Sequence, residues 1–242
     1  MENRMTVQGI EEGDLRNMSD KAIGEYFPFW NTLTAVQRQA IAASSALRRV
    51  DKGTVVHNGS QDCVGLLLVN SGRLRAFVLS DEGKEITLYR LLERDICLFS
   101  ASCMMNSIQF DIVVEAEEPT SFWQIPAPVY QGLMRESAAV ANYTNELMAS
   151  RFSDVMWVMD QILNKKMDAR LAAFLLEEST LQGSDSLSLT HEEIAHHLGS
   201  AREVITRLLK YLQEKGLVTL FRGGVTLADK EQLAVLAADS LR

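Results

Sequence analysis

No stretch of this sequence approaches the roughly 18 consecutive apolar residues that a membrane-spanning helix requires. The polar start, from Met1 to Arg4, leads into no apolar segment of the kind found in secretion signals. Cysteine is also scarce, because the chain has only three, at positions 63, 97 and 103. An odd number this small predicts no disulfide framework, which fits a reducing compartment. We therefore expect a cytoplasmic protein without membrane contact.

Positive charge is the next scarce feature. The chain has 24 lysines and arginines against 32 acidic residues, which gives a net charge of −8. Residues 167–242 alone hold eight basic and eleven acidic residues. Because DNA-binding domains usually carry a basic excess, any binding to DNA must depend on where individual arginines and lysines lie. Hydrophobic residues still make up 47% of the chain, enough for one large core or two modest ones.

The first half of the chain changes from a helical to a strand pattern. Residues 1–45 are predicted to be helical, most clearly where Ala35 to Ile41 follow Thr34, a suitable N-cap. From about Leu47, short β-type runs alternate with glycine, asparagine and aspartate turns. The runs are 55–56, 65–69, 73–78, 85–89, 111–115 and 121–125. So many short strands at close spacing predict a barrel or a sandwich.

A long helical segment follows Pro126 and Pro128. Some of its apolar residues repeat at alternating intervals of four and three, the spacing of a coiled-coil seam. These residues are Met148, Phe152, Val155, Met159 and Ile162. An amphipathic helix packed on its own domain would explain part of the pattern. Met156, Trp157 and Leu163 add further apolar residues beside the seam. Together they give this helix more apolar surface than one packing partner can cover, which favours packing against a second subunit.

Residues 167–242 predict three helices followed by a hairpin. The predicted helices are 169–178, 191–197 and 201–215, and the predicted hairpin strands are 217–221 and 225–227. Thr190 and Glu193 have the spacing of a capping box before the second helix. Gly199 suits the left-handed turn between two steeply crossed helices. Gly223-Gly224 supply the positive φ angles that a tight hairpin needs.

The third predicted helix has an apolar and a charged side. Val204, Leu208 and Leu212 are expected to face the core. The exposed side, near the helix start, holds Arg202, Glu203, Thr206 and Arg207. Arginine can donate two hydrogen bonds to guanine and glutamate can accept one from cytosine, so this side is suited to reading base edges. The candidates for phosphate contacts are Lys210, Lys215 and Arg222. A small helical domain with solvated charges is the alternative interpretation.

The segment from Thr190 to Lys210 resembles the DNA-binding signature of the Crp/Fnr family of regulators. The resemblance implies an α+β fold with three parts. These are an antiparallel, jelly-roll-like β-roll that senses an effector (1–136), a long dimerisation helix (137–166) and a C-terminal winged helix-turn-helix (167–242). It also implies a bacterial transcription regulator that binds double-stranded DNA as a homodimer, with RNA polymerase as a further partner.

The resemblance assigns roles to individual residues, and its strongest part is the Arg-Glu-x-x-x-Arg core at 202–207. Arg202, Glu203 and Arg207 would read bases. Thr190 and Arg170 would contact phosphate. Glu203, Thr206 and Arg207 resemble the Fnr-type Glu-x-x-Ser-Arg pattern, with threonine in place of serine. That pattern implies a half-site similar to TTGA.

By the same resemblance, the β-roll lacks the residues that hold a cyclic nucleotide. Relatives that bind cyclic AMP use a Gly-Glu pair for the ribose and an Arg-Ser pair for the phosphate, whereas Leu98-Phe99 and Phe110-Asp111 stand at those places. No arginine occurs between Cys97 and Thr120, and a buried phosphate needs a cation or backbone donors. We therefore expect a small apolar or aromatic effector. The expected pocket residues are Phe99, Met104, Phe110 and Asp111; alternatively, the two phenylalanines fill the pocket themselves.

Other chemistries have fewer of the residues that they need. An Fnr-type iron–sulfur cluster needs four thiolates, one more than the chain has. Cys97 and Cys103 are candidates for a thiol switch, although free cysteines are more often buried and inert, and His57 with Cys97 are candidates for haem ligands. A zinc hydrolase needs histidines four residues apart on one helix face, whereas His191 and His196 are five apart. We predict no cofactor, no metal and no enzymatic activity.

Overall fold

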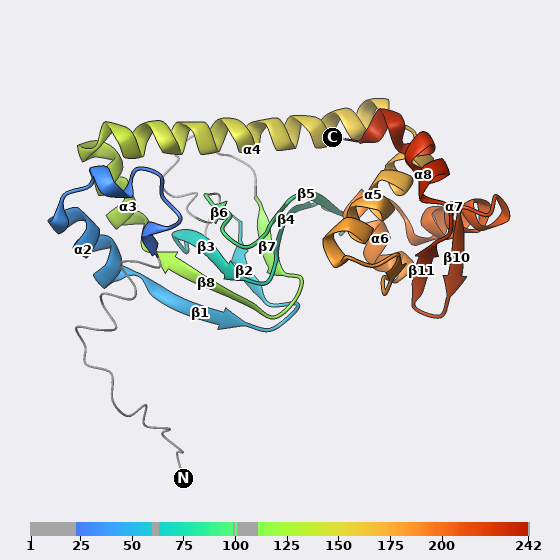
Figure 1. The fold of residues 1–242 in the computed structure, drawn as a ribbon, viewed down its shortest axis with the longest axis horizontal. Coiled ribbons are helices and arrows are strands. Elements are labelled where there is room, and N and C mark those ends of the chain that lie inside the picture. Colours follow the sequence, from blue (N-terminus) through green and yellow to red (C-terminus); the bar gives the residue numbers. More distant parts are fainter. Residues whose placement is uncertain (1–22, 60–62, 99, 101–110, 242) are drawn as a thin grey trace, which may run out of the picture. The chain divides into compact units, whose positions relative to one another are not determined.

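The computed structural model describes residues 23–59, 63–98, 100 and 111–241 (Figure 1). Its contacts divide the chain into two compact units. The first unit contains the described residues up to Ala76 together with Arg90–Arg151, and the second contains Phe77–Tyr89 together with Phe152–Arg242. Both units combine helices with antiparallel strands, which confirms the predicted α+β class.

In the described part of the chain, the first unit contains the short helix η1 (Trp30–Thr32), followed by the helix α2 (Ala35–Ser44). Thr34 caps α2 as its sequence predicts. The Thr34 hydroxyl accepts a hydrogen bond from the Gln37 amide at 3.3 Å, and the Gln37 side chain accepts one from the Thr34 amide at 3.0 Å. Each bond satisfies a backbone or side-chain group at the helix start.

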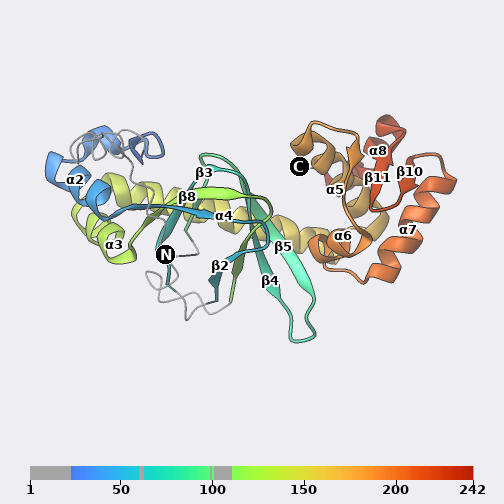
Figure 2. The same ribbon diagram turned by 90° about the horizontal axis from the view of Figure 1, so that it is seen from below.

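Two four-stranded sheets form the β part of the fold. One has the order β1-β8-β3-β6 and the other has the order β2-β7-β4-β5. The first sheet is built from β1 (Ala46–Val50), β3 (Leu66–Ser71), β6 (Ile96–Cys97) and β8 (Thr120–Ile125). The second is built from β2 (Val55–Asn58), β4 (Leu74–Leu79), β5 (Glu85–Leu91) and β7 (Val113–Ala116). Figure 2 shows β4 and β5 as neighbouring strands.

The core of the first unit joins β3 and β8 to the helices α3 (Ala127–Glu136) and α4 (Ala138–Asn164). Tyr130 lies fully buried in this core, and its hydroxyl is 2.9 Å from that of Thr144 on α4. Burial raises the pKa of Tyr130 to about 12. Burying each large side chain of this kind contributes roughly 1.5–3 kcal/mol, so the core anchors the start of α4.

The second unit contains the three helices and the hairpin that the sequence predicts. The helices are α5 (Met167–Gln182), α6 (His191–Leu198) and α7 (Arg202–Glu214), and the hairpin is β10 (Val218–Phe221) with β11 (Gly224–Leu227). Three further elements are β9 (Ser186–Leu187), α8 (Lys230–Ala237) and η3 (Ala238–Ser240). Strand β9 pairs with β11, which gives a three-stranded sheet of order β10-β11-β9.

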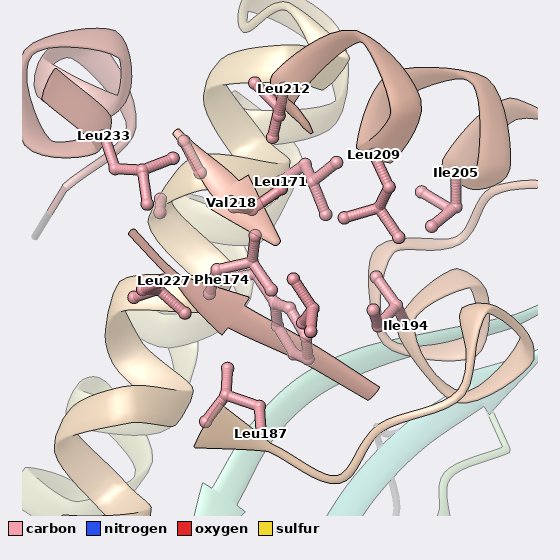
Figure 3. Packing of buried hydrophobic residues seen from close by; sticks show 14 of the residues in the cluster. Leu171, Phe174, Leu187, Ile194, Ile205, Leu209, Leu212, Val218, Leu227 and Leu233 are labelled. Carbon is pink, nitrogen blue, oxygen red and sulfur yellow. The ribbon is translucent and has the colours of Figure 1, made fainter. Parts of the chain in front are cut away.

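The buried face of α7 differs from the one predicted. Ile205, Leu209 and Leu212 are fully buried in the core of the second unit, which Figure 3 shows from close by. The predicted set of Val204, Leu208 and Leu212 was therefore wrong at Val204, which is half-buried and is not part of this core. Leu208 packs against the same core but stays partly exposed. Ile205 and Leu209 belong to one buried cluster with residues of α5, α6 and the small sheet, and this shared core sets which face of α7 is buried.

Candidate nucleic-acid interface

The helix α6 has a local stabilising feature at each end, and a tight turn after its last residue joins it to α7. Thr190 accepts a hydrogen bond from the Glu193 amide at 3.1 Å, and its own amide donates to the Glu193 carboxylate at 2.8 Å, which confirms the capping box. Gly199 ends α6 in the left-handed conformation with φ +64°. These features match the helix-turn-helix that the sequence predicts.

Gly199 has a second constraint, which only the fold reveals. A Cβ atom at this position would lie 2.5 Å from Cγ1 of Ile86 on β5. Next to it, the Thr87 hydroxyl is 2.9 Å from Nδ1 of His197. The part of the β4–β5 hairpin that belongs to the second unit therefore packs directly on the end of α6, and any side chain at position 199 would displace it.

Arg170 on α5 supports the same turn from within. Its guanidinium donates a 2.7 Å hydrogen bond to the Leu198 carbonyl, and the residue is only 8% exposed. Burial lowers the pKa of Arg170 from its usual value. A guanidinium committed to a buried carbonyl is unsuited to the phosphate contact that the family resemblance assigned to it. The structure therefore gives Arg170 a different task, which is to fix the end of α6.

The exposed side of α7 carries the residues predicted to read bases. Arg202, Glu203 and Arg207 are exposed, whereas Thr206 is half-buried. At about 100° per residue, these positions and the exposed Lys210 fall on one side of the helix, opposite the buried face. Two more of the predicted phosphate contacts, Lys215 and Arg222, are also exposed, and the Lys215 ammonium lies 5.7 Å from the Tyr211 ring centre.

Two of these side chains, Arg202 and Thr206, have partners on α6. Nε of Arg202 is 3.9 Å from the Glu192 carboxylate, and that carboxylate is also 3.4 Å from Nε2 of His196. Arg202 is 65% exposed, so the pair is a weak one. Glu192 was not singled out by the sequence, because an acidic residue in the first turn of a helix is common. Its position makes it a partner for the exposed Arg202.

Comparisons with known proteins match this arrangement. Residues 169–236 match the model of the Crp-like helix-turn-helix domain. The transcriptional activator protein anr of Pseudomonas aeruginosa is 26% identical over 202 residues, which are 80% of this chain and 81% of that protein. The fumarate and nitrate reduction regulatory protein of Yersinia pestis is 25% identical over 200 residues, 78% of each chain.

A crystal structure from Eubacterium rectale, assigned to the Crp/Fnr family of transcriptional regulators, is more similar still. It is 56% identical, with a TM-score of 0.87, and the match covers 88% of this chain and 99% of that chain. The chain belongs to the Crp/Fnr family. Its relatives are transcription regulators and not enzymes, and this Crp/Fnr protein is a DNA-binding transcription regulator. None of the helices in the described ranges is long and apolar enough to span a membrane.

Crp/Fnr regulators bind DNA and act as dimers, and α4 has an apolar surface suited to that purpose. Among the predicted seam residues, Phe152 is 66% exposed, Met159 45% and Ile162 41%. Val155 is half-buried, and Met148 instead packs against the core of the first unit. Two flanking residues, Met156 and Leu163, extend the exposed stripe. We call Phe152, Met156, Met159, Ile162 and Leu163 the α4 stripe.

The predicted effector pocket is only partly covered by the structure. Phe99, Met104 and Phe110 lie outside the described residues, as does Cys103. Asp111 is described and is exposed. The predicted haem candidate His57 is almost fully buried on β2. Among the described residues, no group of three or more histidine, cysteine or acidic side chains is placed to hold a metal ion.

The structure describes two of the three cysteines, Cys63 and Cys97, and their environments differ. Cys97 is fully buried on β6, so it is shielded from the solvent that a thiol switch requires. Cys63, in contrast, is disulfide-bonded and exposed. The sequence predicted no disulfide framework, and it did not indicate this single bond at Cys63. The sequence contained no signal for this bond, because three cysteines at irregular spacing do not indicate a pairing.

Proposed function

We propose that this Crp/Fnr regulator reads a DNA duplex with the exposed side of α7. Arg202, Glu203, Thr206 and Arg207 would contact base edges in the major groove. The phosphate contacts would come from Thr190 at the start of α6, Lys210 and Lys215 on or beside α7, and Arg222 in the β10–β11 turn. The observation that carries this proposal is the division of α7 into one charged, exposed side and one fully buried side.

The α4 stripe is the proposed dimer contact. Phe152, Met156, Met159 and Leu163 follow intervals of four, three and four, the spacing that brings side chains together along a coiled-coil seam. Leaving so much apolar surface in water on one helix is unfavourable. Two copies of α4 packed along the stripe would bury it and would place two helix-turn-helix units on one DNA molecule.

A selection experiment tests the proposed DNA reading. The wild-type protein is expected to enrich an inverted repeat from a random-sequence duplex library, with half-sites similar to TTGA spaced by about 34 Å. Binding to the enriched duplex should weaken steeply with salt, because each phosphate contact releases counterions. Enrichment of no sequence over the starting library would contradict the proposal.

The effector of the β-roll is proposed to be a small apolar or aromatic molecule and not a cyclic nucleotide. The absence of arginine between Cys97 and Thr120 supports this part, because a buried cyclic phosphate without a cation loses several kcal/mol of hydration. A second candidate is control by thiol chemistry. The exposed, disulfide-bonded Cys63 favours it, since exposed disulfides are the ones that reductants reach most easily.

One titration separates these forms of control. The affinity for the enriched duplex is measured alone, with millimolar cyclic AMP, and with dithiothreitol. We expect cyclic AMP to leave the affinity unchanged, because the sequence has no arginine between Cys97 and Thr120 to bind its phosphate. A change with dithiothreitol that is absent in Cys63→Ser would establish thiol control in place of a ligand. Saturable strengthening by cyclic AMP would contradict the proposed effector class.

A further inference from the structure

His191 is the first residue of α6, and its ring lies against α7. Its Nδ1 atom is 2.9 Å from the hydroxyl oxygen of Thr206. The Thr206 hydroxyl also donates to the Arg202 carbonyl at 2.9 Å, within α7. The two helices of the DNA-binding motif are therefore joined by a hydrogen bond that ends on one of the proposed base-reading residues.

This hydrogen-bond chain determines where the proton of His191 is. A threonine hydroxyl has a single hydrogen, and that hydrogen points to the Arg202 carbonyl. Nδ1 of His191 must therefore carry a hydrogen and donate it to Thr206. In a neutral imidazole the other nitrogen, Nε2, then has no hydrogen and can only accept. Among the described residues, no group makes a hydrogen bond with Nε2.

The surroundings of the ring disfavour its positive charge while no DNA is bound. Partial burial, followed by the positive charges of Arg202 and Lys210, lowers the pKa of His191 below its ordinary value. Glu192, the neighbouring carboxylate on α6, lies beside Arg202 at 3.9 Å. His191 is therefore mainly neutral near pH 7, at the edge of a cluster of cations that would attract a phosphate.

We propose that His191 positions Thr206 for base contact through Nδ1 and, when protonated, binds a DNA phosphate through Nε2. The proposal rests on the proposed function, because it assumes that the exposed side of α7 faces DNA. Protonation adds a hydrogen and a positive charge at Nε2, and it leaves the bond from Nδ1 to Thr206 in place. A phosphate near the ring stabilises this charged form, so the complex takes up a proton that the free protein lacks.

The direction of the pH effect follows from this proton uptake. The pKa of His191 is lowered in the free protein and is raised when a phosphate approaches, so DNA binding is tighter at the pH where the protonated form prevails. Affinity should rise as pH falls from about 8 to about 6. Each unit by which binding raises the pKa corresponds to a factor of at most ten in affinity, so we expect a severalfold effect.

Two substitutions at position 191 and one at position 196 separate positioning from phosphate binding. In His191→Asn the amide nitrogen stands close to the place of Nδ1, so the bond to Thr206 is kept but no proton can be gained. His191→Ala removes both functions. His196→Asn is the matched control, because it removes a titratable histidine from the same helix without touching Thr206. Melting temperatures of all variants show whether each one is folded.

The measurements are the affinity for the duplex enriched by wild type, at several pH values, and the base preference of each variant. We expect His191→Asn to keep the base preference and to lose the severalfold rise at low pH, and His196→Asn to keep both. His191→Ala should lose both. In a protein that already carries Thr206→Val, adding His191→Ala should cause no further change in base preference.

Two results would overturn the proposal. One is a His191→Asn variant that keeps the full pH dependence of wild type, and the other is a folded His191→Ala variant with unchanged base preference. Failure of the proposed function gives a different result. In that case Arg207→Ala would bind the enriched duplex as wild type does, whatever residue stands at position 191.

Discussion

Replacing Arg207 by alanine is expected to weaken binding to the enriched duplex by about 1–3 kcal/mol, roughly fivefold to more than a hundredfold. Arg207 is exposed on the side of α7 opposite the buried Ile205, Leu209 and Leu212. An arginine there can donate two hydrogen bonds to a guanine, and alanine leaves both acceptors without partners. The base preference at one position of each half-site should relax at the same time. Titration against the enriched duplex and its single-base variants measures both effects.

Lys215→Ala is the matched control for Arg207→Ala. Lys215 is exposed just after the last residue of α7 and is proposed to contact phosphate. Its loss should weaken binding to every sequence by a similar factor and reduce the slope of affinity against salt by about one. If Arg207→Ala instead behaved like Lys215→Ala, with base preference intact, the assignment of Arg207 to base reading would be wrong.

Introducing glutamate at Met159 is expected to convert the dimer into a monomer. Met159 is 45% exposed in the middle of the α4 stripe. Two copies packed along this stripe would place the two new carboxylates in an apolar contact, where charges without partners cost several kcal/mol. Sedimentation at micromolar concentration should show a monomer. Affinity for the two-site duplex should fall on the order of a hundredfold or more, because the second half-site no longer binds within the same complex.

Val235→Glu provides the control for this substitution. Val235 is 69% exposed on α8, outside the α4 stripe. The same change of charge there should leave the dimer and its affinity for the duplex close to wild type. A dimer that survives Met159→Glu would place the subunit contact elsewhere on the molecule.

Much of the helix-turn-helix is determined by the sequence alone, because its signals act over a few residues. Thr190 and Glu193 cap α6 through bonds that span three positions. Gly199 adopts the left-handed conformation that its lack of a side chain allows. The paired glycines in the turn likewise predict the β10–β11 hairpin. The same local reasoning found α2 and most of the β-strands, together with the charged side of α7.

Other features depend on groups that are distant in the sequence, and only the tertiary structure decides them. β1, with the sequence Ala-Leu-Arg-Arg-Val, has no clear strand pattern of its own, and it forms because β8 pairs with it along its whole length. Arg170 is buried because the Leu198 carbonyl, 28 residues later, needs a donor. Which face of α7 is buried depends on α5 and the small sheet, and the contact of His191 with Thr206 depends on how α6 crosses α7. Local patterns state which residues prefer to be buried or paired, whereas the partner that each one meets depends on packing between separate elements.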